Sequence, residues 1–306
     1  MELMLAPMAG YTDIVYRSMC MDFGCDQTIT EMVSAKALYY KDKKTLELMK
    51  TSKNEKNVHL QIFGYEEDIF KIIAKEIPHK YNYININMGC PAPKIVKNFS
   101  GSYLLNDPEK CRRLIYALKS STDIPVSIKI RRGINDGNQG LKVAKIAEEE
   151  GVSMVIVHGR TKEEYYSGLA DWDFIEEVAE NLSIPVIGNG DITDYDSFVE
   201  RTKNSKVVGV AIGRGAIGNP FIFKEIKTKL RGEEYIPPTD REKLDTFLIH
   251  LGKMLEVYPK KVAINEMRKQ FVGYSSGIYG SKELRHKLNT LNEYEDISKM
   301  INDHFK

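Results

Sequence analysis

The chain has 306 residues, of which 42% are hydrophobic and 28% are charged, and this ordinary globular composition excludes wholesale disorder. Its 44 basic and 43 acidic residues give a net charge of +1, which excludes a polycation that would bind nucleic acid through bulk charge. No apolar run approaches the roughly 20 residues of a membrane span, and the first residues lack the pattern of a secretory signal, so we expect no membrane association.

Short apolar segments rich in Val and Ile recur from the start of the chain to about residue 231, and stretches with helical periodicity lie between them. The eight predicted strands are 4–9, 27–31, 58–64, 83–87, 125–131, 154–159, 185–190 and 207–213. The helices predicted between them include 68–77, 108–120, 141–150, 172–181 and 194–202. Eight such units predict an α/β fold of the (β/α)8 TIM-barrel type, with an open doubly wound sheet as the alternative.

The pattern changes near residue 231. Pro237 and Pro238, set among charged residues, indicate a linker. Beyond it the apolar spacing predicts helices over 241–258 and 261–272, with further helices before residue 306. We therefore predict two domains, a catalytic barrel at 1–231 and an all-helical domain at 239–306.

In a barrel of this kind, the chemistry lies at the carboxyl ends of the strands. The first predicted strand ends in Pro7, Met8 and Ala9, where a proline and small neighbours leave room for a flat ligand against the backbone. Near the end of the third, the Gln61 amide offers donors and an acceptor that suit the edge of a heteroaromatic ring. The plainer alternatives are a simple strand-to-helix turn and a satisfied interior amide.

A cysteine follows the fourth predicted strand, because Cys90 stands between Gly89 and Pro91. A thiol is mainly protonated at neutral pH, so it can serve as a general acid. A base partner would instead make it a nucleophile, and no base lies within a few residues. The pattern favours the acid role, with a buried structural cysteine as the alternative.

Cations follow the fifth and sixth predicted strands. Lys129 and Arg131 are two residues apart, so they lie on one face of a strand and need an anionic partner. A structural salt bridge is the alternative interpretation. His158 and Arg160 place further donors at the same end of the barrel.

The last two predicted strands end in glycine-rich turns, which contain Asn189, Gly190 and Asp191 in one case and Gly213 and Arg214 in the other. Loops in these positions commonly hold a phosphate, because glycines let backbone N–H groups approach it and an arginine can neutralise it. FMN fits all of these features together: its phosphate in the turns, and its pyrimidine edge near Gln61 and Lys129, where Lys129 would stabilise the anionic reduced flavin.

As a set, these segments resemble the tRNA-dihydrouridine synthase family. The matching segments are 5–13, 87–91 with Lys94 and 101–102 following, 129–131, 158–161, 188–192 and 212–216. Residues 267–269 are similar to the family's helical-domain signature, although the usual Arg-Lys-His is Arg268-Lys269-Gln270 here. The resemblance implies an FMN-bound barrel with a helical tRNA-binding domain, in which NADPH, as a transient reductant, supports reduction of the C5–C6 double bond of specific uridines in tRNA to 5,6-dihydrouridine.

The resemblance also implies residue roles, with Cys90 as the proton donor to C5 of the uracil. The implied cofactor-binding residues are Pro7, Met8, Ala9, Gln61, Lys129, His158, Asn189, Gly190, Asp191, Gly213 and Arg214. Weaker candidates for contact with the uridine or the RNA are Asn87, Arg131, Arg160, Arg268 and Lys269.

Two other functions stay open on the sequence. Dihydroorotate dehydrogenase, another FMN TIM-barrel oxidoreductase, has a similar Asn-x-Ser-Cys-Pro turn near its fourth strand but lacks a helical RNA-binding domain. A non-enzymatic phosphate-binding barrel would leave Cys90 and the pair Lys129 and Arg131 without a role. Ribosomal RNA as the substrate and NADH as the reductant also stay open.

The four cysteines, Cys20, Cys25, Cys90 and Cys111, form no Cys-x-x-Cys pair. We therefore expect reduced thiols, no metal site and a cytoplasmic location. We also expect a monomer.

Overall fold

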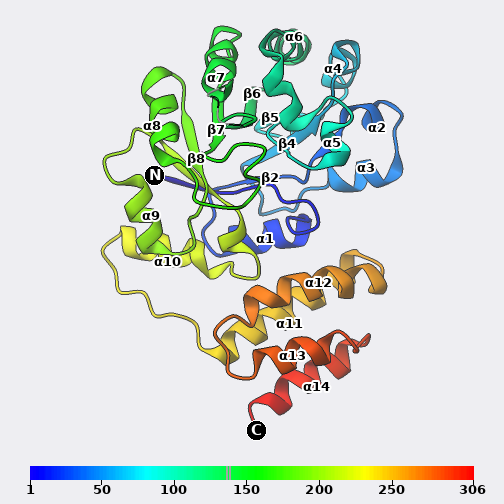
Figure 1. Ribbon diagram of the computed structural model, residues 1–306. Coiled ribbons are helices and arrows are strands. Elements are labelled where there is room, and N and C mark those ends of the chain that lie inside the picture. The colour runs from blue at the N-terminus through cyan, green and yellow to red at the C-terminus, as the bar shows by residue number, and fades with distance from the viewer. Residues whose placement is uncertain (136, 138) are drawn as a thin grey trace.

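The computed structural model describes residues 1–135, 137 and 139–306. Within these residues, nine strands form one parallel sheet in the order β2-β1-β9-β8-β7-β6-β5-β4-β3, and pairing of β2 with β4 closes it (Figure 1). The strands are β1 (Glu2–Leu5), β2 (Gln27–Ile29), β3 (Val33–Ser34), β4 (Val58–Phe63), β5 (Tyr83–Met88), β6 (Val126–Arg131), β7 (Met154–His158), β8 (Val186–Asn189) and β9 (Gly209–Ile212).

The predicted closed barrel of eight strands is confirmed. The strands described above fill eight positions, because β2 and β3 together occupy one position beside β4. β2 pairs with the start of β4 and β3 with its end. The predicted strand 27–31 is therefore too long. The hydroxyl of Thr30 accepts a hydrogen bond from the backbone N–H of Gln61 at 3.0 Å, which replaces a main-chain ladder bond and separates the two strands.

The first strand also differs from its prediction, since it begins at Glu2 and ends at Leu5 rather than covering 4–9. Ala6 still donates its N–H to Ile212, but Pro7 has no N–H to continue the ladder. The chain then turns at Met8, whose carbonyl accepts from both Tyr11 and Thr12. This turn carries Pro7, Met8 and Ala9 to the carboxyl end of the barrel.

Helices surround the sheet, and α2, α4, α6, α7 and α8 contact one another in that order (Figure 1). The helices up to residue 230 are α1 (Ile14–Asp22), α2 (Ala35–Tyr39), α3 (Lys43–Leu48), α4 (Glu67–Ala74), α5 (Pro93–Val96), α6 (Pro108–Lys119), α7 (Gln139–Glu149), α8 (Trp172–Asn181), α9 (Tyr195–Thr202) and α10 (Phe221–Leu230). Short 3-10 helices η1 (Gly101–Asn106) and η2 (Arg214–Ala216) follow β5 and β9. The predicted helix 194–202 starts one residue later because Asp194 is its N-cap and forms a capping box with Ser197.

After the proline linker, four helices follow: α11 (Asp240–Val257), α12 (Lys260–Tyr274), α13 (Ser281–Leu288) and α14 (Tyr294–His304). Their apolar faces share one hydrophobic cluster with Val15 and Met19 of α1, so the helices pack against that side of the barrel (Figure 1). The two domain boundaries at 231 and 239 stay predictions.

Gln270 fixes α12 to the barrel. The family that the sequence resembles usually has His at this position. The Oε1 of Gln270 accepts from the N–H of Gly218 at 2.8 Å, and its Nε2 donates to the carbonyl of Tyr11 at 2.8 Å. The side chain is buried. Helix α12 approaches so closely that a Cβ at Gly273 would overlap the carbonyl of Ile217. The amide therefore supplies one donor and one acceptor across this contact.

Candidate active site

A cavity of about 730 Å³ opens at the carboxyl ends of the barrel strands. The structure brings all the predicted cofactor-binding residues together on its wall, namely Pro7, Met8, Ala9, Gln61, Lys129, His158, Asn189, Gly190, Asp191, Gly213 and Arg214. Cys90, Asn87, Arg131 and Arg160 line the same cavity, whereas Arg268 and Lys269 do not. The roles of these residues stay predictions, and the following contacts show what each side chain can do.

Sheet register places the polar side chains of the interior beside one another. Gln61 is aligned with Asn85 and Asn87 with Lys129, while Asn189 is aligned with His158. Aligned residues on adjacent strands face the same side of a sheet, so the alternation along each strand concentrates polar groups inside the barrel.

A chain of hydrogen-bonded side-chain amides connects β4 to the loop that carries Cys90. Asn87 donates to Gln61 Oε1, and Gln61 donates to Asn85 Oδ1, both at 2.8 Å. Asn87 Oδ1 then accepts from the backbone N–H groups of Gly89 and Cys90. Asn87 thus positions the loop, and Gln61 keeps a free N–H and a free lone pair for a ligand. The sequence analysis missed Asn85, although its two-residue spacing from Asn87 was the available signal.

Cys90 is half-buried in the cavity wall. Burial raises the pKa of its thiol above the usual value, against the opposing effects of the backbone N–H of Ala92 and of the cations Arg131 and Lys129. Among the described residues, no carboxylate or imidazole hydrogen-bonds the Cys90 sulfur. A protonated thiol without a base partner suits a proton donor better than a nucleophile.

Lys129 lies in the cavity without an anionic partner among the described residues. Its Nζ donates to Asn189 Oδ1 at 2.9 Å, and the described residues include no carboxylate within ion-pair distance. Removal from water and the neighbouring Arg131 lower the pKa of Lys129 to about 7. The salt-bridge alternative therefore does not hold for this lysine, and the cavity keeps a place for an anionic ligand.

Arg131 also has no carboxylate partner in the described part of the chain, but its guanidinium is hydrogen-bonded. It donates to the carbonyls of Gly89 at 2.9 Å, Thr161 at 2.6 Å and Tyr165 at 2.8 Å. These contacts connect the Cys90 loop to the loop that follows β7. The structure thus gives Arg131 a positioning role at the cavity wall.

Asp191 binds two arginines. Arg160 donates to its carboxylate at 2.8 Å and Arg214 at 2.9 Å. Arg160 is almost fully buried, and it also donates to the carbonyls of Ser167 and Gly168. Both Asp191 and Arg160 are therefore engaged by protein groups. Their contacts orient Arg214, which is half-exposed and can reach a ligand.

The electrostatics of the cavity favour an anion. Burial and then the cations Lys129, Arg131, Arg160 and Arg214 hold the pKa of His158 well below its usual value, so its imidazole is neutral. Because β8 and β9 are paired with Asn189 opposite Ala211, the turns at Gly190 and Gly213 lie side by side. Two adjacent glycine turns with an arginine between them match the donor set of a phosphate site.

The sequence analysis missed the tyrosines of the loop after β7. Tyr165 and Tyr166 line the cavity, and the Tyr166 ring centroid lies 5.5 Å from the Arg131 guanidinium and 5.2 Å from that of Arg214. The signal was weak, since two adjacent tyrosines in a loop have no periodicity that marks a site.

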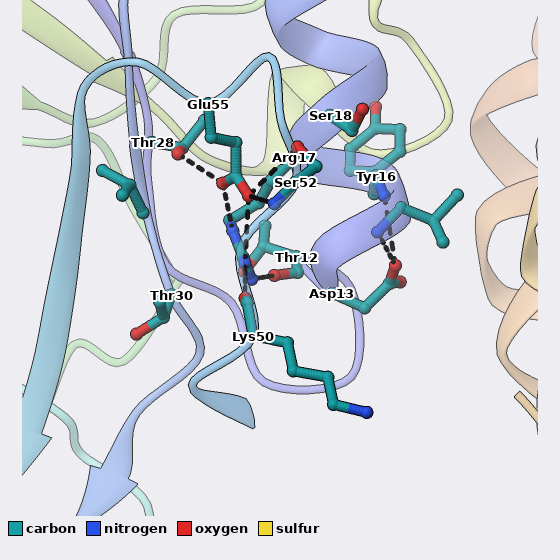
Figure 2. A network of polar contacts seen from close by, with 12 residues as sticks. Thr12, Asp13, Tyr16, Arg17, Ser18, Thr28, Thr30, Lys50, Ser52 and Glu55 are labelled. Carbon is teal, nitrogen blue, oxygen red and sulfur yellow. Dashed lines mark hydrogen bonds and ion pairs between the residues drawn. The ribbon is translucent and has the colours of Figure 1, made fainter. Parts of the chain in front are cut away.

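Figure 2 shows a buried ion pair between Arg17 and Glu55. Hydrogen bonds through Thr12 connect it to Met8, in the cavity wall. Arg17 Nε donates to Glu55 at 2.6 Å, and neither side chain is exposed. Arg17 also donates to the carbonyl of Thr12 at 3.0 Å. The Thr12 hydroxyl in turn accepts from the N–H of Met8 at 2.9 Å. The pair therefore holds this cavity wall in place.

We predict that Arg17→Met destabilises the protein by about 3–5 kcal/mol, because it leaves the Glu55 charge buried without a cation. Only neutral donors from Thr28 and Ser52 then remain for this carboxylate. Urea unfolding at pH 7 measures the loss. Adding Glu55→Leu should recover part of it, since no unpaired charge then remains. As a control, Arg241→Ala breaks an exposed pair with Asp245 and should change stability by less than about 1 kcal/mol. Equal losses for Arg17→Met and Arg241→Ala would contradict the prediction.

Arg268 and Lys269 differ in their surroundings. Arg268 donates to the carbonyls of Leu288 and Leu291 at the end of α13, at 3.3 and 2.9 Å, so its guanidinium is used within the helical bundle. Lys269 pairs with Glu266, and its Nζ lies 5.7 Å from the ring centroid of Tyr11, a cavity residue. Contact of either residue with RNA stays a prediction, and the structure favours Lys269 for it.

We expect Lys269→Ala to lower the log–log salt slope of tRNA binding by about one unit, since one phosphate contact is lost. Arg268→Ala should instead destabilise the protein by about 1–3 kcal/mol, because the carbonyls of α13 lose a charged donor. Fluorescence anisotropy between 50 and 300 mM salt gives the slope, and thermal unfolding gives the stability. A slope unaffected by Lys269→Ala would remove this residue from the RNA surface.

Fold and cavity together define a TIM-barrel enzyme with its chemistry at the carboxyl ends of the strands. Histamine dehydrogenase from Rhizobium sp. 4-9 has a similar fold, with a TM-score of 0.52 and 14% identity over 83% of this chain and 48% of that one. So does 6-hydroxypseudooxynicotine amine oxidase from Pseudomonas geniculata N1, with a TM-score of 0.54 and 13% identity over 75% of this chain and 47% of that one. The chain spans about half the length of these structures, and the likeness concerns the fold alone.

The family described as dihydrouridine synthase matches residues 4–306. The probable tRNA-dihydrouridine synthase of Rickettsia conorii is 36% identical over 95% of this chain and 89% of its own length. The tRNA-dihydrouridine synthase B of Pseudomonas putida is also 36% identical, over 95% of this chain and 88% of its own. The chain therefore belongs to the dihydrouridine synthase family, and it is an oxidoreductase, as the sequence predicted. This membership sets aside the dihydroorotate dehydrogenase alternative and the non-enzymatic barrel.

Two further observations concern the described part of the chain. It contains no helix that is long and apolar enough to cross a membrane. It also contains no group of three or more His, Cys, Asp or Glu side chains that could hold a metal ion.

Proposed function

We propose that the chain reduces specific uridines in tRNA to 5,6-dihydrouridine, with FMN bound in the barrel cavity, NADPH as a transient reductant and Cys90 as the proton donor. The observation that supports this proposal is that Lys129 and Cys90 line the same cavity. Lys129 has no carboxylate partner among the described residues, and Cys90 has a raised pKa. The relatives from Rickettsia conorii and Pseudomonas putida, both called tRNA-dihydrouridine synthases, support the same reaction.

The residues present fit FMN. The turns at Gly190 and Gly213, with Arg214, would hold its phosphate, since they offer backbone donors and a cation in an otherwise positive cavity. Gln61, with one N–H and one lone pair free, would bind the pyrimidine edge. Lys129 would lie near the same edge.

When bound, FMN would supply the hydride that reduces the C5–C6 double bond of the uracil. The protein then has three tasks. Lys129 would hold positive charge beside the ring system. Cys90 donates its proton to C5, where negative charge builds as C6 is reduced. Asn87 and Arg131 hold the loop that carries the thiol.

The target uridine must leave its stack to enter the cavity, which costs a few kcal/mol. Phosphate contacts from the helical bundle would offset this cost. The sequence shows no dinucleotide-binding fingerprint, which fits NADPH as a transient visitor.

The test is to map dihydrouridine in RNA from a strain that lacks the gene. We expect loss of dihydrouridine at one or a few tRNA positions, with recovery when the wild-type chain is restored. The purified protein should be yellow and should oxidise NADPH. An unchanged set of dihydrouridines in tRNA, or losses confined to ribosomal RNA, would contradict the proposal.

A further inference from the structure

Three aromatic side chains, Tyr65, Phe99 and Tyr103, form a cluster that we call the rim cluster. The Phe99 ring centroid lies 5.5 Å from that of Tyr65 and 5.1 Å from that of Tyr103. Phe99 is 51% exposed, and its backbone has φ = 57°, in the left-handed region. This conformation is strained for a bulky residue, and partial burial of the ring gives little in return. Phe99 closes the end of α5, where its N–H donates to Val96 and the N–H of Ser100 donates to Ile95. Glycine or asparagine usually occupies such a left-handed position, so the helix end does not require the exposed aromatic ring that stands there.

The rim cluster is rigidly connected to the Cys90 loop. The N–H of Ser102 donates to the Cys90 carbonyl at 3.0 Å, which closes the segment between them. Gly101 packs so tightly that a Cβ there would lie 3.1 Å from Cys90 Cβ. Within the loop, the carbonyl of buried Ile95 accepts from Asn98 and Ser100. These bonds fix the position of Phe99 relative to the candidate proton donor.

An exposed cation lies two residues before Phe99 in the chain. Lys97 is exposed, and among the described residues no carboxylate pairs with it. The neighbouring acid Glu67 is already paired with Lys110 and Arg113. Lys110 Nζ also lies 3.8 Å from the ring centroid of Tyr65. The cluster thus combines an exposed aromatic ring with an exposed cation that no carboxylate neutralises among the described residues, and single-stranded nucleic acid binds to such a combination.

Its place on the barrel complements the helical bundle. The bundle contacts the turns after β1 and β9, through Tyr11 and Gly218. The closed barrel has eight strand positions when β2 and β3 are counted as one. Strand β5, which leads into the Cys90 loop, is four positions from β9 and three positions from β1. The rim cluster follows β4 and β5 in the chain, so it lies on the opposite side of the barrel from β9, outside the cavity wall itself.

We propose that the rim cluster is a second RNA site, in which Phe99 stacks on an unpaired base that flanks the uridine held in the cavity. Lys97 binds a phosphate of the same strand. The inference rests on the proposed function, because it assumes that RNA enters the cavity. Stacking on Phe99 would hold the strand open and offset the cost of extruding the target base.

The test is binding of tRNA that lacks dihydrouridine, isolated from the deletion strain, to the purified flavoprotein. Stacking contributes ~1–3 kcal/mol per base, so Phe99→Ala should weaken the affinity about 5- to 150-fold. Its salt slope should stay unchanged, since no charge is lost. Lys97→Ala should lower the slope by about one unit. Phe99→Trp, which keeps an aromatic face, should bind at least as well as the wild type.

Three controls keep the test decisive. Phe99→Asn tolerates the left-handed backbone and should lose the same affinity as Phe99→Ala, which separates the ring from any folding effect. Tyr116→Ala removes an aromatic residue on the outer helix α6 that is more exposed than Phe99, and it should have no effect. Flavin content and NADPH oxidation without RNA should not change in any variant. Unchanged affinity in both Phe99→Ala and Phe99→Asn, with a wild type that modifies tRNA, would overturn this inference alone. A wild type that neither binds nor modifies tRNA would overturn the proposed function as well.

Discussion

Replacing Cys90 with alanine is expected to slow the step with uridine about 10²–10⁴-fold, the range that a positioned general acid contributes. Flavin retention, NADPH oxidation and tRNA binding should stay near their wild-type values, because the proposed proton donor acts only in the step that protonates C5. The measurement is single-turnover reduction of tRNA by the pre-reduced enzyme. Cys111→Ala, which removes a buried thiol outside the cavity, is the matched control and should not change this rate.

The pH dependence distinguishes an acid from a nucleophile. Burial raises the pKa of the Cys90 thiol, so the thiol is protonated at neutral pH. An acid loses activity as it deprotonates, and the wild-type rate should therefore fall as pH rises through the pKa of Cys90. A nucleophile needs the thiolate, and its rate would rise over the same range.

Two results would remove the acid role. One is an unaffected single-turnover rate in Cys90→Ala. The other is a wild-type rate that rises with pH, together with a covalent enzyme–RNA adduct in normal turnover. An adduct alone is not decisive, since a thiolate can also add to an electron-poor pyrimidine off the reaction path.

The fold and the position of the site could be predicted from the strand pattern and from the general location of barrel active sites at the carboxyl ends of the strands. Parallel strands bring their carboxyl ends to one place, so the residues that follow each strand had to meet there, and Gln61, Lys129 and Asn189 do so. The break between β2 and β3 could not be predicted from the sequence. It depends on a contact with another strand, in which the N–H of Gln61 on β4 donates to the Thr30 hydroxyl instead of to a main-chain carbonyl.

The sequence does not predict which groups the charged side chains bind within the protein. Arg160 and Asp191 are typical ligand-binding residue types, but in the fold they bind each other, and nothing in their spacing of 31 residues indicates this. Arg268 similarly contacts carbonyls 20 and 23 residues away. Such contacts depend on where two loops or helices meet, which a single sequence does not encode in a periodic pattern. Motifs therefore locate a site more reliably than they assign the function of each charge in it.

If the proposed function holds, replacing Lys129 with methionine should strongly lower the rate of uridine reduction and modestly weaken FMN retention, because the cavity would lose the cation proposed to lie at the pyrimidine edge. Methionine keeps most of the side-chain volume, so the effect reports charge. Lys142→Ala, which removes an exposed lysine on α7, is the control and should leave both quantities unchanged. An unchanged rate of tRNA reduction in Lys129→Met would contradict this role.

The pKa of Lys129 provides a second and independent readout. Without a bound anion, burial and Arg131 lower this pKa to about 7, below the ordinary value of 10.5 that applies in the unfolded chain. Between these values the unfolded chain binds more protons than the folded one, so Lys129 makes the flavin-free protein more stable as pH rises from about 7 to 10. An anion beside Lys129 would raise its pKa again. Binding of FMN at pH 8 should therefore take up protons in the wild type and fewer in Lys129→Met, which calorimetry in buffers of different ionisation enthalpy measures. Equal proton uptake in the two proteins would show that the FMN charge does not lie beside Lys129.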